Sequence, residues 1–229
     1  MFEILKGLDY TPFLVSLKLA SLTTFALFII CVPLAFFMAR KNFRGKSVIE
    51  SIISLPLVLP PSVLGFYLLV FLSPYSVLGE FFDKHFGLRL VFNFSGLVIA
   101  SCIYSLPFMF SPLVSGFRSL PRSLFWACDS LDKSYFSKLF RVALPAIRHS
   151  LLSALVICFA HTMGEFGVVL MIGGSVSEQT KVASIAIYEA TETLDFAQAH
   201  VYSALMLIFS FAVLLIMHFL VVRGAKIEA

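Results

Sequence analysis

Charge is scarce in this sequence. Charged residues make up 13% of the 229 residues, whereas soluble domains contain about 25%. Hydrophobic residues make up 59%, and the mean hydropathy is +0.96. This balance excludes an ordinary soluble domain and indicates a polytopic membrane protein.

Cysteine is also scarce, and its placement excludes two kinds of site. The four cysteines are scattered and form no C-x-x-C pair, so we expect neither a disulfide framework nor a cysteine metal site. His161 and Glu165 share a helix face, but no further His or Cys stands at ligand spacing. We therefore expect no metal and no bound cofactor, and we interpret His161 as a polar group satisfied inside the bundle.

A nucleotide-binding loop and an internal repeat are missing as well. The segment RGKS at residues 44–47 ends like a Walker loop, but Arg40 stands where that motif needs its first glycine. The lack of a repeat argues against the inverted-repeat secondary transporters. No cluster of catalytic side chains is evident either, so we do not expect an enzyme.

The sequence does contain five long apolar stretches, at residues 19–39, 48–72, 94–117, 147–172 and 196–222. Each is long enough to cross a hydrocarbon layer of about 30 Å at a rise of about 1.5 Å per residue. We expect an all-α polytopic bundle of about five transmembrane helices, forming one domain over residues 1–229 in membrane lipid. Asp195 stands where an N-cap for the last helix is expected.

Basic residues fall mostly on one side of the predicted membrane. Twelve of the 17 lysines and arginines follow the first, third and fifth stretches, among them Arg118, Arg223 and Lys226. The positive-inside rule therefore predicts the N-terminus outside and the C-terminus in the cytoplasm. The opposite side carries five basic and eight acidic residues, so its loops offer an anion no electrostatic attraction. No nucleic-acid partner is expected.

The segment 123–141 is too short and too charged to span. Its apolar residues recur at helical spacing, with Asp129, Asp132, Lys133 and Lys138 between them. An interfacial helix in the lipid headgroups is one interpretation. A helix that fills a groove on a soluble partner is the other. The pattern alone does not choose between them.

A resemblance favours the partner. Ala127-Cys128, Asp132 and the later Leu144-Pro145 resemble the cytoplasmic "EAA" loop of ABC-importer permeases, although Trp126, Cys128 and Asp132 replace its Glu, second Ala and Gly. This resemblance implies a type I importer permease fold and a coupling-helix loop at 123–141 within the domain. The implied coupling residues are Trp126, Ala127, Cys128, Leu131, Asp132, Phe136, Leu144 and Pro145.

Two further segments, LPLVLPPSVLGFYLL at 55–69 and MGEFG at 163–167, resemble molybdate ABC-transporter permeases. That family implies two permeases with two cytoplasmic ATPases, which carry ATP and Mg, and an extracytoplasmic binding protein in a bacterial inner membrane. We also expect a homodimer because five helices make only a thin wall. Tungstate or sulfate is the alternative cargo, and an ion-gradient-driven secondary transporter is the alternative class.

Helix-breaking residues mark a candidate translocation path. Prolines in the second stretch remove backbone donors and must kink or break it, either as an ordinary kink or as a bend beside the path. Glu165 in the fourth stretch should face protein or a wet cavity. Because a carboxylate repels an oxyanion, we expect it to have a structural or gating role. The candidate residues are Pro60, Pro61, Ser62, Gly65, Gly164, Glu165 and Gly167.

The segment 175–194 is too polar to span. It forms either a short outer helix at the pore mouth or a solvated loop. In both cases it is a candidate contact for the binding protein.

Overall fold

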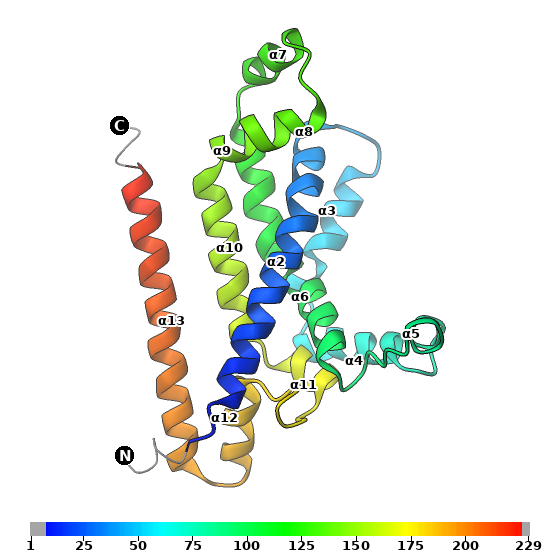
Figure 1. Cartoon of the computed structure of the whole chain (residues 1–229), viewed down its shortest axis with the longest axis vertical. Coiled ribbons are helices and arrows are strands. Elements are labelled where there is room, and N and C mark those ends of the chain that lie inside the picture. Colours follow the sequence, from blue (N-terminus) through cyan, green and yellow to red (C-terminus); the bar gives the residue numbers. More distant parts are fainter. Residues whose placement is uncertain (1–7, 226–229) are drawn as a thin grey trace.

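The computed structural model describes residues 8–225, without the side chains of residues 217, 218 and 220–225. Lys226 and the side chain of Arg223, which contributed to the predicted orientation, lie outside the description. Within the described range every regular element is a helix. The longest helices stand roughly parallel along one long axis (Figure 1).

Three helices cross the bundle without interruption: α2 (Thr11–Arg40), α6 (Phe94–Ser119) and α13 (Phe196–Ala225). Each contains a stretch long and apolar enough for a membrane span. They confirm the first, third and fifth predicted stretches. Asp195 accepts a hydrogen bond from the Gln198 backbone N–H at 3.0 Å, which confirms the predicted cap of α13.

The second predicted stretch is not one continuous helix. It consists of α3 (Lys46–Ser54), the 3₁₀ turn η1 (Leu55–Leu57) and α4 (Pro61–Leu72), bent by 109°. Pro60 is extended, with ψ 136°, and Pro61 begins α4, as expected for a residue before proline and for a proline at the first helical position. The prolines therefore break this helix, and α4 runs across the bundle toward α5 (Val77–Phe86) (Figure 1).

The fourth predicted stretch is broken as well. Only α10 (Arg148–Met163) follows the bundle axis, and a non-helical link separates it from α11 (Gly167–Gly173). Before α10 the chain turns by 83° from a helical run of α8 (Tyr135–Ser137), the π-helical η2 (Lys138–Ala143) and α9 (Leu144–Ala146). The continuous span predicted at 147–172 was therefore wrong.

The core lies between α2, α6 and α10, where fully buried side chains such as Leu27, Met109 and Leu113 pack together. The segment predicted as either an outer helix or a loop contains α12 (Ala183–Glu192), which packs against α13. Buried Ser16 of α2 accepts a hydrogen bond from the Ala183 backbone N–H at 2.9 Å. This bond satisfies a free amide at the start of α12 and attaches the helix to the bundle.

The two segments that follow the helix breaks, α4 and α11, pack directly on each other. A Cβ added to Gly65 would lie 2.9 Å from Met171 Cβ and 3.2 Å from Val168 Cα, and one added to Gly167 would lie 2.8 Å from Pro61 Cβ. Only glycine permits this separation, as in closely packed membrane helices.

Gly65→Ala should therefore destabilise the protein by about 1–3 kcal/mol, because the new methyl group overpacks this contact. Thermal unfolding of the purified protein in detergent measures the loss. Gly164→Ala is the matched control, since an added Cβ there meets its nearest atom at 3.7 Å. Equal unfolding temperatures for the two variants would contradict the packing argument.

Candidate functional site

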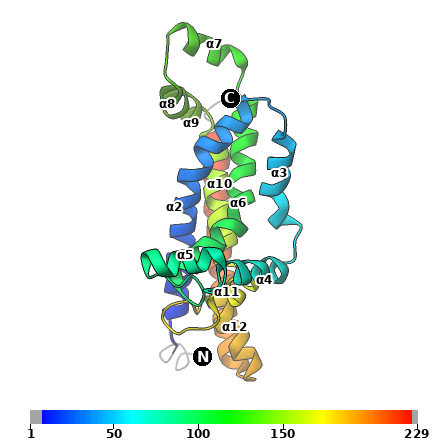
Figure 2. The ribbon, with the colours of Figure 1, turned by 90° about the vertical axis from the view of Figure 1, so that its right-hand side faces the viewer.

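The loop between α6 and α10 lies at the basic end of the bundle, which we define by Arg40, Arg118 and Arg122. Instead of the single helix predicted at 123–141, the structure has α7 (Arg122–Ser130), a turn, and then α8 and η2. We call residues 122–146 the basic loop. It projects beyond the ends of α2, α6 and α10 (Figures 1 and 2).

Asp132 ends α7 in a left-handed conformation, with φ 49°. The Asp132 N–H donates to Asp129 O at 3.0 Å and the Lys133 N–H donates to Cys128 O at 3.1 Å. This pair of bonds is the Schellman motif, in which the left-handed position is usually glycine. The glycine of the EAA pattern therefore corresponds to a position where the backbone itself favours glycine.

Aromatic side chains fix the base of the basic loop. The Phe36 ring of α2 lies 5.9 Å from that of Phe125 and 5.2 Å from that of Tyr135, measured between ring centroids. The Arg40 guanidinium lies 3.6 Å from the Phe125 centroid, a cation–π contact. Lys138 forms an ion pair with Asp129, which ties η2 to α7.

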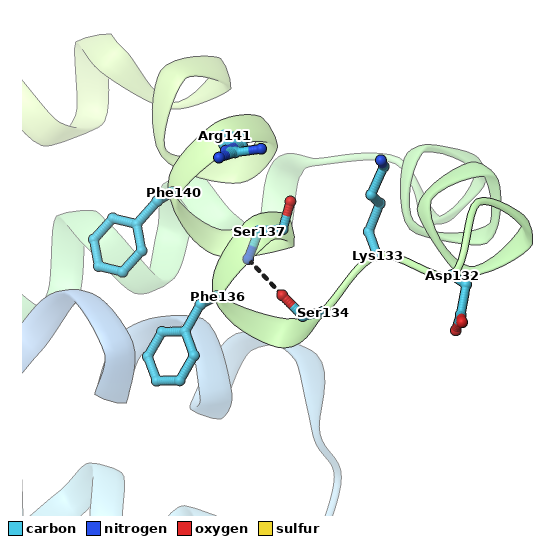
Figure 3. Close-up of a pocket in the computed structure, with 7 residues that line it drawn as sticks. All are labelled: Asp132, Lys133, Ser134, Phe136, Ser137, Phe140 and Arg141. Atoms are coloured by element: carbon cyan, nitrogen blue, oxygen red, sulfur yellow. Dashed lines mark hydrogen bonds between the residues drawn. The ribbon is translucent and has the colours of Figure 1, made fainter.

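Three large apolar side chains of the basic loop are largely exposed. Trp126 is 65% exposed, Leu131 68% and Phe136 65%. We call these three residues the docking surface. Beside them an open cavity of about 590 Å³ is lined by Asp132, Lys133, Phe136, Phe140 and Arg141, among others (Figure 3). Apolar side chains on a rigid, charged support are typical of a protein-contact site.

The other predicted coupling residues lie around this surface. Ala127 is exposed beside Trp126, whereas Cys128 is buried against the bundle. Leu144 is half-buried and Pro145 exposed, both in α9 at the bend into α10.

A second polar site surrounds Glu165, in the break between α10 and α11. Glu165 is 4% exposed as a residue, and its carboxylate accepts hydrogen bonds from the hydroxyls of Ser101 and Ser105 of α6, both at 2.6 Å. His161 Nδ1 lies 2.9 Å from Ser105 Oγ. Ser184 of α12 donates to the Glu165 backbone carbonyl at 2.5 Å. The predicted internal role of Glu165 and His161 therefore has a defined geometry.

The candidate path residues form two groups. Pro61, Gly65 and Gly167 meet at the contact of α4 with α11, and Pro60 and Ser62 are exposed beside it. Glu165 lies in its polar cluster, with Gly164 exposed at the end of α10. Ser101 was not among the predicted residues, although it lies one helical turn before Ser105 on α6. That spacing was a usable signal for two donors on one face.

Comparison with known proteins gives a consistent family. The family described as "Binding-protein-dependent transport system inner membrane component" matches residues 31–224. The molybdenum transport system permease protein ModB of Azotobacter vinelandii is 42% identical over 207 residues, which cover 90% of this chain and 91% of the relative. The ModB protein of Haemophilus influenzae is 33% identical over 71% of this chain and 72% of its own.

Two other proteins are less similar to this chain in sequence. The sulfate transport system permease protein CysT of a Synechocystis strain is 29% identical over 84% of this chain and 67% of its own. A solved bacterial ABC transporter for the import of alginate has a similar fold, with a TM-score of 0.74 over 93% of this chain and 78% of its own. Its sequence identity of 16% supports the fold alone.

Changing Asp132 should test the strained turn of the basic loop. Asp132→Gly should stabilise the protein by about 1 kcal/mol or less, because glycine accepts positive φ freely. Asp132→Val should instead destabilise it by about 1–2 kcal/mol, because a β-branched residue is a genuine outlier there. Thermal unfolding measures both, and a stabilising valine would contradict the turn geometry.

Removing a hydrogen-bond donor to the Glu165 carboxylate should destabilise the protein. Ser105→Ala is expected to lower the free energy of unfolding by about 1.5–3 kcal/mol, because a buried carboxylate loses a hydrogen bond. Denaturation in detergent measures the change. Ser111→Ala on the exposed face of the same helix should stay within about 0.5 kcal/mol of the wild type. A similar loss in both variants would count against a specific role for the cluster.

Proposed function

The chain belongs to the family of binding-protein-dependent transport system inner membrane components, and from this membership we propose that it is the membrane-spanning subunit of an ATP-driven molybdate importer. The observation that carries the proposal is the 42% identity with the molybdenum permease of Azotobacter vinelandii over nearly the whole of both chains. The sulfate permease likeness is weaker. Tungstate and sulfate remain the alternative cargoes because they are tetrahedral dianions too.

The basic end is assigned to the cytoplasm and the N-terminus to the outside. Most lysines and arginines gather on the side of the basic loop, and cytoplasmic loops carry the excess of basic residues. Under this orientation α12 lies at the outer end of the bundle, where an extracytoplasmic binding protein would deliver the anion.

In a pair of these chains, the two docking surfaces are proposed as the contacts with two cytoplasmic ATPase subunits, which bind ATP and Mg. Its three side chains are too exposed to stabilise this chain by themselves, and their base is held by Phe36, Phe125 and Tyr135. A force applied to Trp126, Leu131 or Phe136 would therefore reach α2 through the contacts of Phe36. This chain would need no catalytic group of its own.

The translocation path is proposed to lie between two copies of this chain, because the five predicted spans of one copy make only a thin wall. The broken segments α4 and α11 would form the moving wall. Irregular backbone at membrane depth is tolerated where it lines a cavity or is buried in protein. Pro60 and Gly164 are exposed in the single chain, so in the pair these breaks would line the path. Alternating access would follow from closure and reopening of the ATPases. An ion-gradient-driven transporter is the rival class, and it needs no ATPase contact.

Phe136→Ala and Leu131→Ala should each reduce ATP-dependent uptake by more than tenfold, because contact hot spots of this kind contribute about 2 kcal/mol or more. Uptake into proteoliposomes and co-purification of the ATPase measure the loss. Both side chains are exposed, so folding should not change. Leu207→Ala, equally exposed but on α13 and outside the basic loop, is the control. Unchanged uptake and assembly in the two test variants would refute the coupling role.

The cargo is tested in the same vesicles. With its binding protein and ATPases, the permease should import radiolabelled molybdate when ATP is enclosed, and excess unlabelled tungstate should compete more strongly than sulfate. Uptake that follows an ion gradient without ATP would contradict the proposed class. Preferred uptake of sulfate would leave the class intact and overturn the cargo.

A further inference from the structure

A small polar cavity at the basic end lies apart from both sites described above. It has a volume of about 230 Å³ and opens between α3 and α6, which Figure 2 shows side by side. The space equals several water volumes of about 30 Å³ each, so a small ion with its hydration can enter. Its polar lining comes from Glu50 and Ser54 of α3 and from Ser111, Ser115 and Arg118 of α6.

The donors of the cavity converge from two helices. Ser111, Ser115 and Arg118 are spaced by four and three residues, so they project from one face of α6. Ser54 faces them from the last turn of α3, just before the helix break. No described residue forms a hydrogen bond with the hydroxyl of Ser54, Ser111 or Ser115. They are therefore available to a ligand that accepts hydrogen bonds.

Arg118 and Glu50 form an ion pair across this cavity. The pair is reachable from solvent, since 45% of the Arg118 side chain and 31% of the Glu50 side chain are exposed. A guanidinium presents a planar fork of donors that suits the oxygens of an oxyanion as well as those of a carboxylate. Glu50 thus occupies the place that a free oxyanion would take.

We infer that Ser54, Ser111, Ser115 and Arg118 form a transient binding site for a tetrahedral oxyanion, in which Glu50 is a built-in competitor. The inference rests on the proposed function, because it concerns the passage of the same cargo. Hydroxyls and a guanidinium all donate hydrogen bonds, so together they match an ion that only accepts them. The arriving dianion displaces the Glu50 carboxylate from Arg118, and the carboxylate returns when the anion leaves.

Competition between Glu50 and the anion suits a transient site on a translocation path, not a site that retains the anion. A transported ion must be bound well enough to enter and weakly enough to leave. A free arginine among three hydroxyls would hold a dianion too long, whereas an arginine paired with Glu50 releases it. Because the site lies between α3 and α6, its occupancy also depends on how closely these helices approach each other.

Equilibrium dialysis of radiolabelled molybdate tests the site directly. The permease is purified with its ATPase subunits in lipid nanodiscs, without the binding protein. Glu50→Gln should bind molybdate about fivefold more tightly than the wild type, because the competing charge is gone. Arg118→Gln should bind more than tenfold more weakly, because a charge-assisted contact is lost. Arg118→Lys keeps the charge but loses the planar fork of donors, so its affinity should lie between those of the wild type and Arg118→Gln.

Matched controls separate this site from a general effect of charge. Glu80 and Lys84 form another exposed ion pair, on α5, away from the cavity, so Glu80→Gln and Lys84→Gln should leave binding unchanged. Ser111→Ala should weaken binding, whereas Ser47→Ala, on α3 outside the cavity, should not.

Two outcomes would overturn the inference. One is equal binding by wild type, Glu50→Gln and Arg118→Gln. The other is no binding by Glu50→Gln even in the millimolar range, which would leave the ion pair as a simple fastening of α3 to α6. Either result could occur while the wild-type complex still imports molybdate, so failure of the site is distinct from failure of the proposed function. Binding of sulfate in preference to molybdate would support the oxyanion site and overturn only the cargo.

Discussion

A carboxylate inside an apolar helix bundle must be fully hydrogen-bonded, and Glu165 imposes this requirement on its surroundings. Ser101 and Ser105 of α6 donate to its two oxygens, and Ser184 of α12 donates to its backbone carbonyl, which the helix break leaves available. An unsatisfied charge there would be far more destabilising than a lost surface contact. The cluster therefore fixes α6 and α12 against the break between α10 and α11. The packing of α11 on α4 depends on this arrangement, because the break sets the direction in which α11 starts.

The sequence predicted most of the fold because lipid permits few solutions. Long apolar runs with basic flanks can only be helices, and α2, α6 and α13 agree with the predicted stretches. Prolines at residues 60 and 61 predicted a kink or a break in the second stretch, and the structure has the break. The break after Met163 was not predicted, because Gly164 and Gly167 are tolerated in continuous membrane helices and only the contacts of α11 with α4 show why this helix ends. Hydropathy indicates which residues can lie in lipid but not the direction in which a helix runs. It therefore could not predict the two bends of 109° and 83°.

The sequence also predicted only part of the candidate site, because its pattern does not show where the chain turns. Trp126, Leu131 and Phe136 are exposed as a docking role requires, but their single predicted helix is two segments joined by the turn at Asp132. The amphipathic pattern continues across that turn, since both segments place apolar residues against the same bundle end. Periodicity alone therefore could not detect it. The departure of Asp132 from glycine was visible in the sequence, whereas its left-handed backbone was not. Glu50 and Arg118 are 68 positions apart in the sequence, so no local sequence pattern could predict their ion pair.

The chain contains a single tryptophan, and it is Trp126. Its indole is largely open to solvent on α7, so the tryptophan fluorescence of the whole permease arises from one point of the basic loop. Burial of an indole against another protein shifts its emission toward the blue. Where the partner subunits lack tryptophan, the emission wavelength of Trp126 therefore reports contact at this point without any added label.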